Sequence, residues 1–265
     1  KVAPQSPSDP RPLSPRGLEN LTAAAHLLSY VRFFHASDQA VGVAAWDHFA
    51  VYLMERAEPA TDADDLAKRL DEAFKPIAPT LQLWPETAQQ IPPIPKPPLT
   101  ATAMKTWKHI GIGTLPSGQR SRVYSSGIER LSVPLKEDSD PRIYVMKALV
   151  GGVSCRLPVK SFADDKGTIP HGKTPDEWEK AAGKPSLTAL NRSTRLAGVA
   201  LAWGVMQHFY PYFEVVNTDW NQALIVALTK AAEDPDKIAY LYTLREMIAK
   251  LHDGHADVSN RSLSP

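Results

Sequence analysis

The stretch RLAGVALAWGVMQHF, residues 195–209, repeats its apolar side chains at steps of three and four residues. This spacing places Leu196, Val199 and Trp203 on one face of an α-helix. Two further apolar segments follow, entered through Asn217-Thr218-Asp219 and Asp234-Pro235-Asp236, whose polar residues favour helix starts. Residues 186–252 are therefore predicted to form three helices.

The same plan occurs earlier in the chain, over residues 17–80. Three helices are predicted there, the second over about 43–57 and the third capped by Thr61 or Asp62. When the two segments are aligned with one gap, matching residues are Leu21 with Leu196, Phe34 with Phe209, Trp46 with Trp220 and Ile77 with Leu251. We interpret this as an internal duplication. The alternative is that two unrelated amphipathic three-helix segments align this well.

The residues between the two helical segments have a different composition. Residues 108–114, 122–133 and 143–162 are rich in Val, Ile, Tyr and Ser, and glycines and prolines interrupt them. This pattern predicts four to six short antiparallel strands, and Asp164-Asp165-Lys166-Gly167 is typical of a turn after them. We therefore expect an α+β fold with two related three-helix units flanking a small antiparallel β domain.

Prolines set the expected boundaries, because proline cannot donate the hydrogen bond that a helix interior or a central strand needs. Of the 24 prolines, 13 lie in two clusters, one near the start of the chain and one over residues 76–98. The expected organisation is an extended proline-rich tail (1–16), a first helical unit (17–84), a proline-rich linker (85–99), a small β domain (100–170), a linker (171–190), a second helical unit (191–258) and the start of a downstream segment (259–265).

Composition excludes several classes of protein. The chain has 30 basic and 29 acidic residues and a net charge of +1, which argues against a nucleic-acid-binding surface. Its longest apolar runs are much shorter than the roughly 20 residues of a membrane span. The single cysteine, Cys155, excludes an internal disulfide and is expected to be a small buried hydrophobe.

The chain contains no Gly-x-Ser-x-Gly elbow, phosphate loop, His-Glu-x-x-His or Cys-x-x-Cys motif, so no cofactor is expected. The nearest approach to a nucleophile motif is Gly151-Gly152-Val153-Ser154-Cys155. Between strands, such glycines indicate a bulge or close packing rather than an oxyanion hole.

The segment Leu251-His-Asp-Gly-His-Ala-Asp-Val258 concentrates ionisable side chains at the end of the last predicted helix. His252, His255 and the neighbouring Asp253 and Asp257 are nitrogen and oxygen donors of the kind that bind metals. No distant third ligand is identifiable, however, and Gly254 favours a turn, so we expect no metal.

A second interpretation is that Gly254 ends the helix in the left-handed conformation and directs His255 into a cleft, as an acid, base or hydrogen-bond donor. The remaining alternative is a simple helix cap with His255 on the surface.

Aromatic residues gather in Tyr210-Pro211-Tyr212-Phe213, where proline must end or kink the preceding helix. Such a cluster either lines a pocket or forms a corner of the core.

Three of these elements together resemble the helical segment that precedes the catalytic domain in S41 serine peptidases, which include the C-terminal processing and tricorn-like proteases. They are the run 195–213, Asp219-Trp220 and Leu251-His-Asp-Gly-His255, in the family's order and spacing. The resemblance covers residues 192–258. Residues 151–158 are similar to a region upstream in some bacterial members.

The resemblance implies peptide-bond hydrolysis by a serine nucleophile that lies downstream of this region. His255 matches the histidine that serves as base in the tricorn-like branch, and the residue before it, often a hydroxyl residue there, is Gly254 here. We expect Asp253, Gly254, Tyr210 and Tyr212 to contact substrate.

The implied protein is secreted or periplasmic, acts on peptides or unfolded proteins, and uses this region to shape or flank the cleft. The rival hypothesis is a standalone binding or scaffolding module without catalysis.

Overall fold

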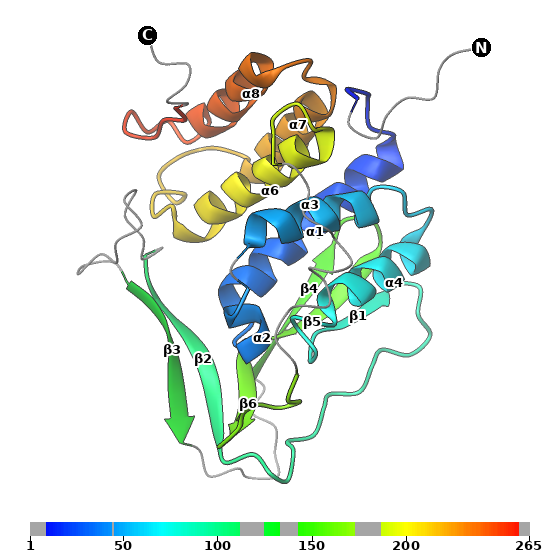
Figure 1. Cartoon of the computed structure of the whole chain (residues 1–265), viewed down its shortest axis with the longest axis vertical. Coiled ribbons are helices and arrows are strands. Elements are labelled where there is room, and N and C mark those ends of the chain that lie inside the picture. Colours follow the sequence, from blue (N-terminus) through cyan, green and yellow to red (C-terminus); the bar gives the residue numbers. More distant parts are fainter. Residues whose placement is uncertain (1–8, 44, 112–124, 133–142, 173–186, 260–265) are drawn as a thin grey trace.

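Two long apolar helices, α1 (Pro15–Phe34) and α6 (Arg192–Phe209), lie side by side in the middle of the computed structural model (Figure 1). The structure describes residues 9–43, 45–111, 125–132, 143–172 and 187–259. The Ser14 side chain caps α1 by accepting from the Gly17 amide, and Asn191 caps α6 in the same way. Both helices are buried on most sides, which is the position expected of a helix without a broad polar face.

The other helices pack around this central pair. Helix α3 contacts both α1 and α6, and α7 also contacts both of them. Helix α4 packs against α3, and α8 packs against α7. The two predicted helical units therefore share one hydrophobic core. The bounds of these helices, with the short α2, are α2 Asp38–Val41, α3 Trp46–Ala57, α4 Ala63–Phe74, α7 Trp220–Glu233 and α8 Lys237–Ala249.

The helices of the two units begin and end at similar residues. Helices α3 and α7 both begin at a tryptophan, and α1 and α6 both end at a phenylalanine. The third helix of each unit is capped by an aspartate in nearly the same backbone conformation, Asp62 at φ −152° and ψ −175° and Asp236 at φ −153° and ψ 177°. The predicted caps are confirmed, with Asp62 rather than Thr61 as the cap of α4.

Two antiparallel sheets complete the fold, and the α+β prediction is confirmed. One has the strand order β1-β5-β4 and the other β3-β2-β6-β7. Among the described residues six strands, β2 to β7, lie within 100–170, as predicted. The strand bounds are β1 Gln82–Pro85, β2 Ala103–Ile110, β3 Ser125–Ser132, β4 Tyr144–Leu149, β5 Val153–Pro158, β6 Lys160–Asp164 and β7 Gly167–Thr168.

Strand β1 lies inside the segment predicted as the first helical unit. It pairs with β5, with Leu83 opposite Cys155, and α4 covers both strands. The proline-rich linker that follows is attached to the same sheet, because the buried Arg156 donates to the Pro92 carbonyl at 2.8 Å and to Gln82 Oε1 at 2.6 Å. The β part therefore packs mainly against the first helical unit.

Some sequence predictions fall outside the described residues. These are residues 1–8 of the predicted tail, 112–114, 122–124 and 133 of the predicted strand segments, 173–186 of the second linker and the segment from 260 onward. No helix within the described ranges is long and apolar enough to cross a membrane.

A buried ion pair joins the start of α6 to the end of α3. The Arg192 guanidinium donates to both carboxylate oxygens of Glu58, at 2.6 and 2.8 Å, and its side chain is fully buried. Planar, bidentate pairs of this kind fix orientation as well as charge. The pair holds the second helical unit against the first.

Replacing Glu58 by alanine is expected to lower the free energy of unfolding by about 3–5 kcal/mol, because Arg192 stays buried without its counter-charge. The double variant Arg192→Met/Glu58→Leu should regain most of that loss. Urea denaturation followed by circular dichroism measures both. A cost below about 1 kcal/mol for the single variant would contradict the proposed role of the pair.

Candidate functional site

The segment after α8 turns back across the end of α6. Tyr210, the residue that follows α6, donates its hydroxyl hydrogen to the Leu251 carbonyl at 2.9 Å. The backbone reverses at His252, which has a φ of 52°. The prediction that Gly254 adopts the left-handed conformation is therefore wrong. Helix α8 ends at Ala249, so the reversal begins before the chain reaches Gly254.

Asp253 and His255 form a local pair within this turn. The His255 amide donates to Asp253 Oδ1 at 2.9 Å, and Nδ1 of the His255 imidazole lies 3.3 Å from the same oxygen. The imidazole is fully exposed. Asp253 thus orients the ring through Nδ1 and leaves Nε2 toward solvent. A carboxylate on one ring nitrogen and an open second nitrogen is an arrangement that suits a general base.

The aromatic residues after α6 divide between core and surface. The Phe213 ring lies 5.1 Å from Tyr210 and 6.1 Å from Trp220, so these rings form a corner of the core. Tyr212 packs against Tyr210 at 5.6 Å and is mostly exposed. Desolvation, followed by the nearby Asp253 carboxylate, raises the pKa of Tyr210. The structure therefore places Asp253 near Tyr210 and directs Tyr212 outward.

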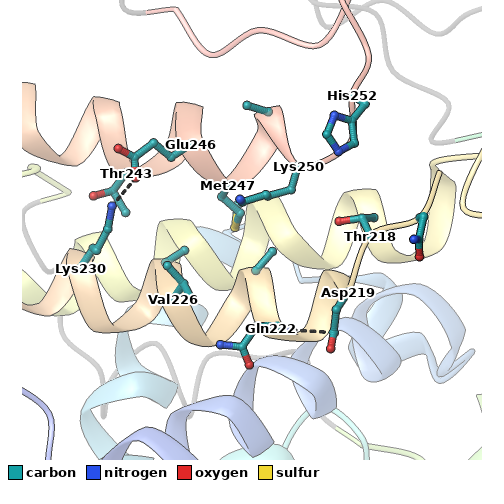
Figure 2. A pocket seen from close by; sticks show the side chains of 14 residues that line it. Thr218, Asp219, Gln222, Val226, Lys230, Thr243, Glu246, Met247, Lys250 and His252 are labelled. Carbon is teal, nitrogen blue, oxygen red and sulfur yellow. Dashed lines mark hydrogen bonds and ion pairs between the residues drawn. The ribbon is translucent and has the colours of Figure 1, made fainter.

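A groove of about 680 Å³ opens between α7 and α8. Figure 2 shows it running along the two helices, with the segment after α8 at one end. Its apolar lining includes Ala223, Val226, Ala227 and Met247. His255 is not among the lining residues, whereas His252 is.

Charged groups border this groove at both ends. Lys230 and Glu246 form an ion pair at one end. At the other end, Asp219 accepts from the Gln222 amide at 2.9 Å and so caps α7. Lys250 and His252 approach from the end of α8.

The sequence interpretation missed this groove and its residues. The alignment of the two units contains a difference in side-chain size that could have indicated the groove. Small side chains in α7, Ala223, Val226 and Ala227, stand where α3 has Phe49, Tyr52 and Leu53.

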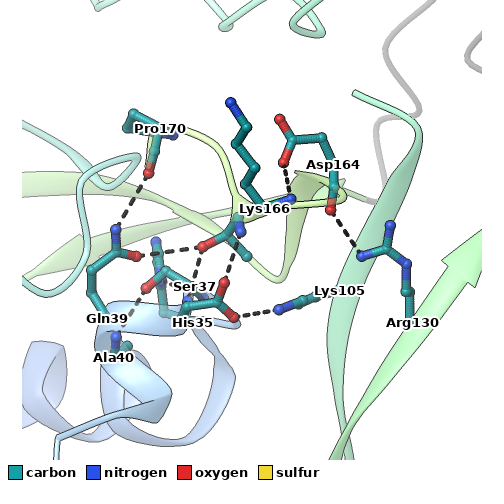
Figure 3. A network of polar contacts seen from close by, with 11 residues as sticks. His35, Ser37, Gln39, Ala40, Lys105, Arg130, Asp164, Lys166 and Pro170 are labelled. Carbon is teal, nitrogen blue, oxygen red and sulfur yellow. Dashed lines mark hydrogen bonds and ion pairs between the residues drawn. The ribbon is translucent and has the colours of Figure 1, made fainter. Parts of the chain in front are cut away.

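A polar network ties the first helical unit to the second sheet (Figure 3). The Asp38 carboxylate accepts from the Thr168 amide at 2.8 Å and pairs with Lys105. The buried His35 imidazole lies 2.9 Å from Ser37 Oγ, which also donates to the Ile77 carbonyl at 2.8 Å. Because Ser37 is buried and hydrogen-bonded to backbone, this serine–histidine pair stabilises the fold.

A second, smaller cavity of about 280 Å³ lies among histidine and aromatic side chains near the end of α6. His109 contacts the Phe33 carbonyl through Nε2 at 2.5 Å and Ser126 Oγ through Nδ1 at 2.8 Å. His208 contacts Ser29 Oγ at 3.0 Å. These contacts join α1 and α6 to the paired strands β2 and β3.

The prediction for Cys155 is confirmed. Its thiol is buried in β5, and burial raises its pKa to about 12, so it is not a reactive thiolate at neutral pH. Gly151 and Gly152, with φ of 81° and 74°, form the turn between β4 and β5. Within the described ranges, no group of three or more His, Cys, Asp or Glu side chains is placed to hold a metal ion.

Comparison with family models, curated proteins and solved structures finds no match to this chain.

Histidine burial predicts a loss of stability in mild acid. Burial lowers the pKa of His26 and His208 to about 4 and that of His35 to about 3, from 6.5. Between pH 6.5 and about 4 the unfolded chain then binds more protons than the folded chain, so stability falls as pH falls. For a fully buried histidine the loss reaches roughly 3 kcal/mol.

Urea midpoints measured from pH 7.5 to pH 4 should therefore decrease steadily. His26→Phe is expected to flatten part of that slope, because the apolar ring removes one titrating group beside Trp203. The control Tyr30→Phe, whose ring lies 6.2 Å from that of His26, should leave the slope unchanged, because a phenol does not titrate in this range. A midpoint independent of pH over this range would show that burial does not suppress protonation of these histidines.

Proposed function

We propose that this chain is an N-terminal region of a secreted or periplasmic S41-type serine peptidase and is inactive by itself. In this role it flanks the cleft in which a peptide or an unfolded protein is cleaved. The resemblance of residues 192–258 to that family is the starting point of the proposal.

The Asp253–His255 pair is the observation that carries the proposal. The His255 ring is held by a carboxylate at Nδ1 and exposes Nε2 on the molecular surface. A histidine oriented in this way is suited to exchange a proton with a serine hydroxyl supplied by another segment. The Tyr210 hydroxyl stabilises the turn by donating a hydrogen bond to the Leu251 carbonyl.

The serine–histidine contacts of the described residues support a proposal in which the catalytic histidine and serine come from different segments of the enzyme. Ser37 and Ser29 are buried. Ser126, the third serine in contact with a histidine, also donates to the Gly111 carbonyl at 2.8 Å. None of these three serines lies at the Asp253–His255 turn. In this proposal the serine nucleophile belongs to a different segment of the enzyme.

A binding or scaffolding module is the second candidate function. The groove between α7 and α8 favours it, because that groove is formed entirely by this chain and needs no catalytic residue.

The chain by itself is expected not to hydrolyse a fluorescein-labelled unfolded protein, because in the proposed enzyme the serine nucleophile belongs to a downstream segment. Release of labelled peptides measures the activity. Hydrolysis that a serine-directed inhibitor abolishes would place the nucleophile in this chain and contradict the proposal that another segment supplies it.

In a peptidase that contains this region and its catalytic segment, His255→Ala is expected to lower kcat/KM by about 10²–10⁴-fold, as removal of a general base does. His171→Ala is the matched control, because His171 is also exposed and paired with a carboxylate, Asp164, at 2.9 Å. An unchanged kcat/KM for His255→Ala would limit His255 to a structural role.

A further inference from the structure

The groove between α7 and α8 has a counterpart in the first helical unit, where large side chains occupy the space. Aligned on Trp46 and Trp220, which begin α3 and α7, Phe49 stands at the position of Ala223. Phe49 is fully buried and meets Phe74 of α4 edge to face at 5.2 Å. An aromatic ring therefore fills the space between α3 and α4.

The second unit has smaller side chains at the same positions of the helix. Ala223, Val226 and Ala227 replace Phe49, Tyr52 and Leu53, and Ile248 replaces Phe74. Met247, which is larger than its counterpart Ala73, lines the groove with a flexible apolar side chain. What remains is an open groove of about 680 Å³ where the first unit has its own ring.

The two carboxylates beside the groove have partners, whereas one lysine has none in the part of the chain that the structure describes. The Glu246 carboxylate is paired with Lys230, and the Asp219 carboxylate caps the α7 backbone. Lys250 lines the groove, and among the described residues its ammonium group has no ion-pair partner within 4.0 Å. An incoming carboxylate would complete that pairing at the end of the groove nearest His252.

We propose that the α7–α8 groove binds an aromatic side chain of a polypeptide that carries a carboxylate next to that residue. The ring occupies the space above Ala223 and Ala227, as Phe49 does in the first unit, and the carboxylate pairs with Lys250. The carboxylate belongs either to an acidic side chain or to the chain terminus. The proposal rests on the groove alone and needs no catalysis, so it holds for either function proposed above.

Titration of the isotope-labelled chain with short peptides, followed by NMR, tests the proposal. The peptides are acetyl-Gly-Phe-Asp-Gly-amide, the same peptide with Ala for Phe, the same peptide with Lys for Asp, and acetyl-Gly-Gly-Phe with a free carboxylate. The Phe-Asp peptide should shift the amide signals of Ala223, Val226 and Lys250. It should bind about tenfold more tightly than the Ala-Asp peptide, as expected for burial of a ring.

The Lys peptide should bind about fivefold less tightly than the Asp peptide, as expected for loss of one partly exposed ion pair. Comparison of the Phe-Asp peptide with the free-carboxylate peptide distinguishes an acidic side chain from a chain terminus as the source of the charge.

Ala223→Phe restores the residue of the first unit and should abolish binding while the chain stays folded. Val226→Tyr is a second variant for the same purpose, and it is safe for folding because Val226 is 42% exposed. Lys250→Gln should weaken the acidic peptide only, and Lys237→Gln, outside the groove, should change nothing. Equal binding of the Phe and Ala peptides, or full binding by both Ala223→Phe and Val226→Tyr, would overturn the proposal.

Discussion

The contact between α1 and α6 is the constraint on which the rest of the structure depends. At their crossing Gly204 faces Ser29, and a methyl group added at Gly204 would stand 2.9 Å from the Ser29 side chain. This close approach allows α3 and α7 each to pack against both central helices. The buried Arg192–Glu58 pair then fixes the two units in one relative position. The buried apolar side chains of both units therefore belong to one hydrophobic cluster.

Equivalent helices have different surroundings in the two units. In the first, α4 covers β1 and β5, and Leu66 and Leu70 are fully buried beneath the sheet. In the second, the corresponding residues Tyr240 and Leu244 of α8 are only partly buried, and the neighbouring groove stays open. The first unit therefore supports the β part of the fold. The second presents the surfaces proposed here for recognition, the groove and the Asp253–His255 turn.

Local chemistry accounts for the elements that were predicted correctly. Asp62, Asp219 and Asp236 cap their helices because an aspartate can accept from the free amides of the first turn. Helix periodicity and the caps are properties of adjacent residues, so a sequence reveals them. Strand β1 and helix α2 were missed, since four-residue elements carry too little periodicity. Strand β1 exists because β5, about 70 residues later, supplies its hydrogen bonds.

The sequence by itself determined the helices, their caps, the strand-rich middle and the buried character of Cys155, because each follows from neighbouring residues and hydropathy. Only the tertiary structure decided that the two units share one core, that His252 rather than Gly254 reverses the chain, and that His255 lies exposed beside Asp253. The groove is also a feature that only the tertiary structure decided. It depends on the distance between α7 and α8 as well as on the small size of Ala223, and packing against the rest of the protein sets that distance.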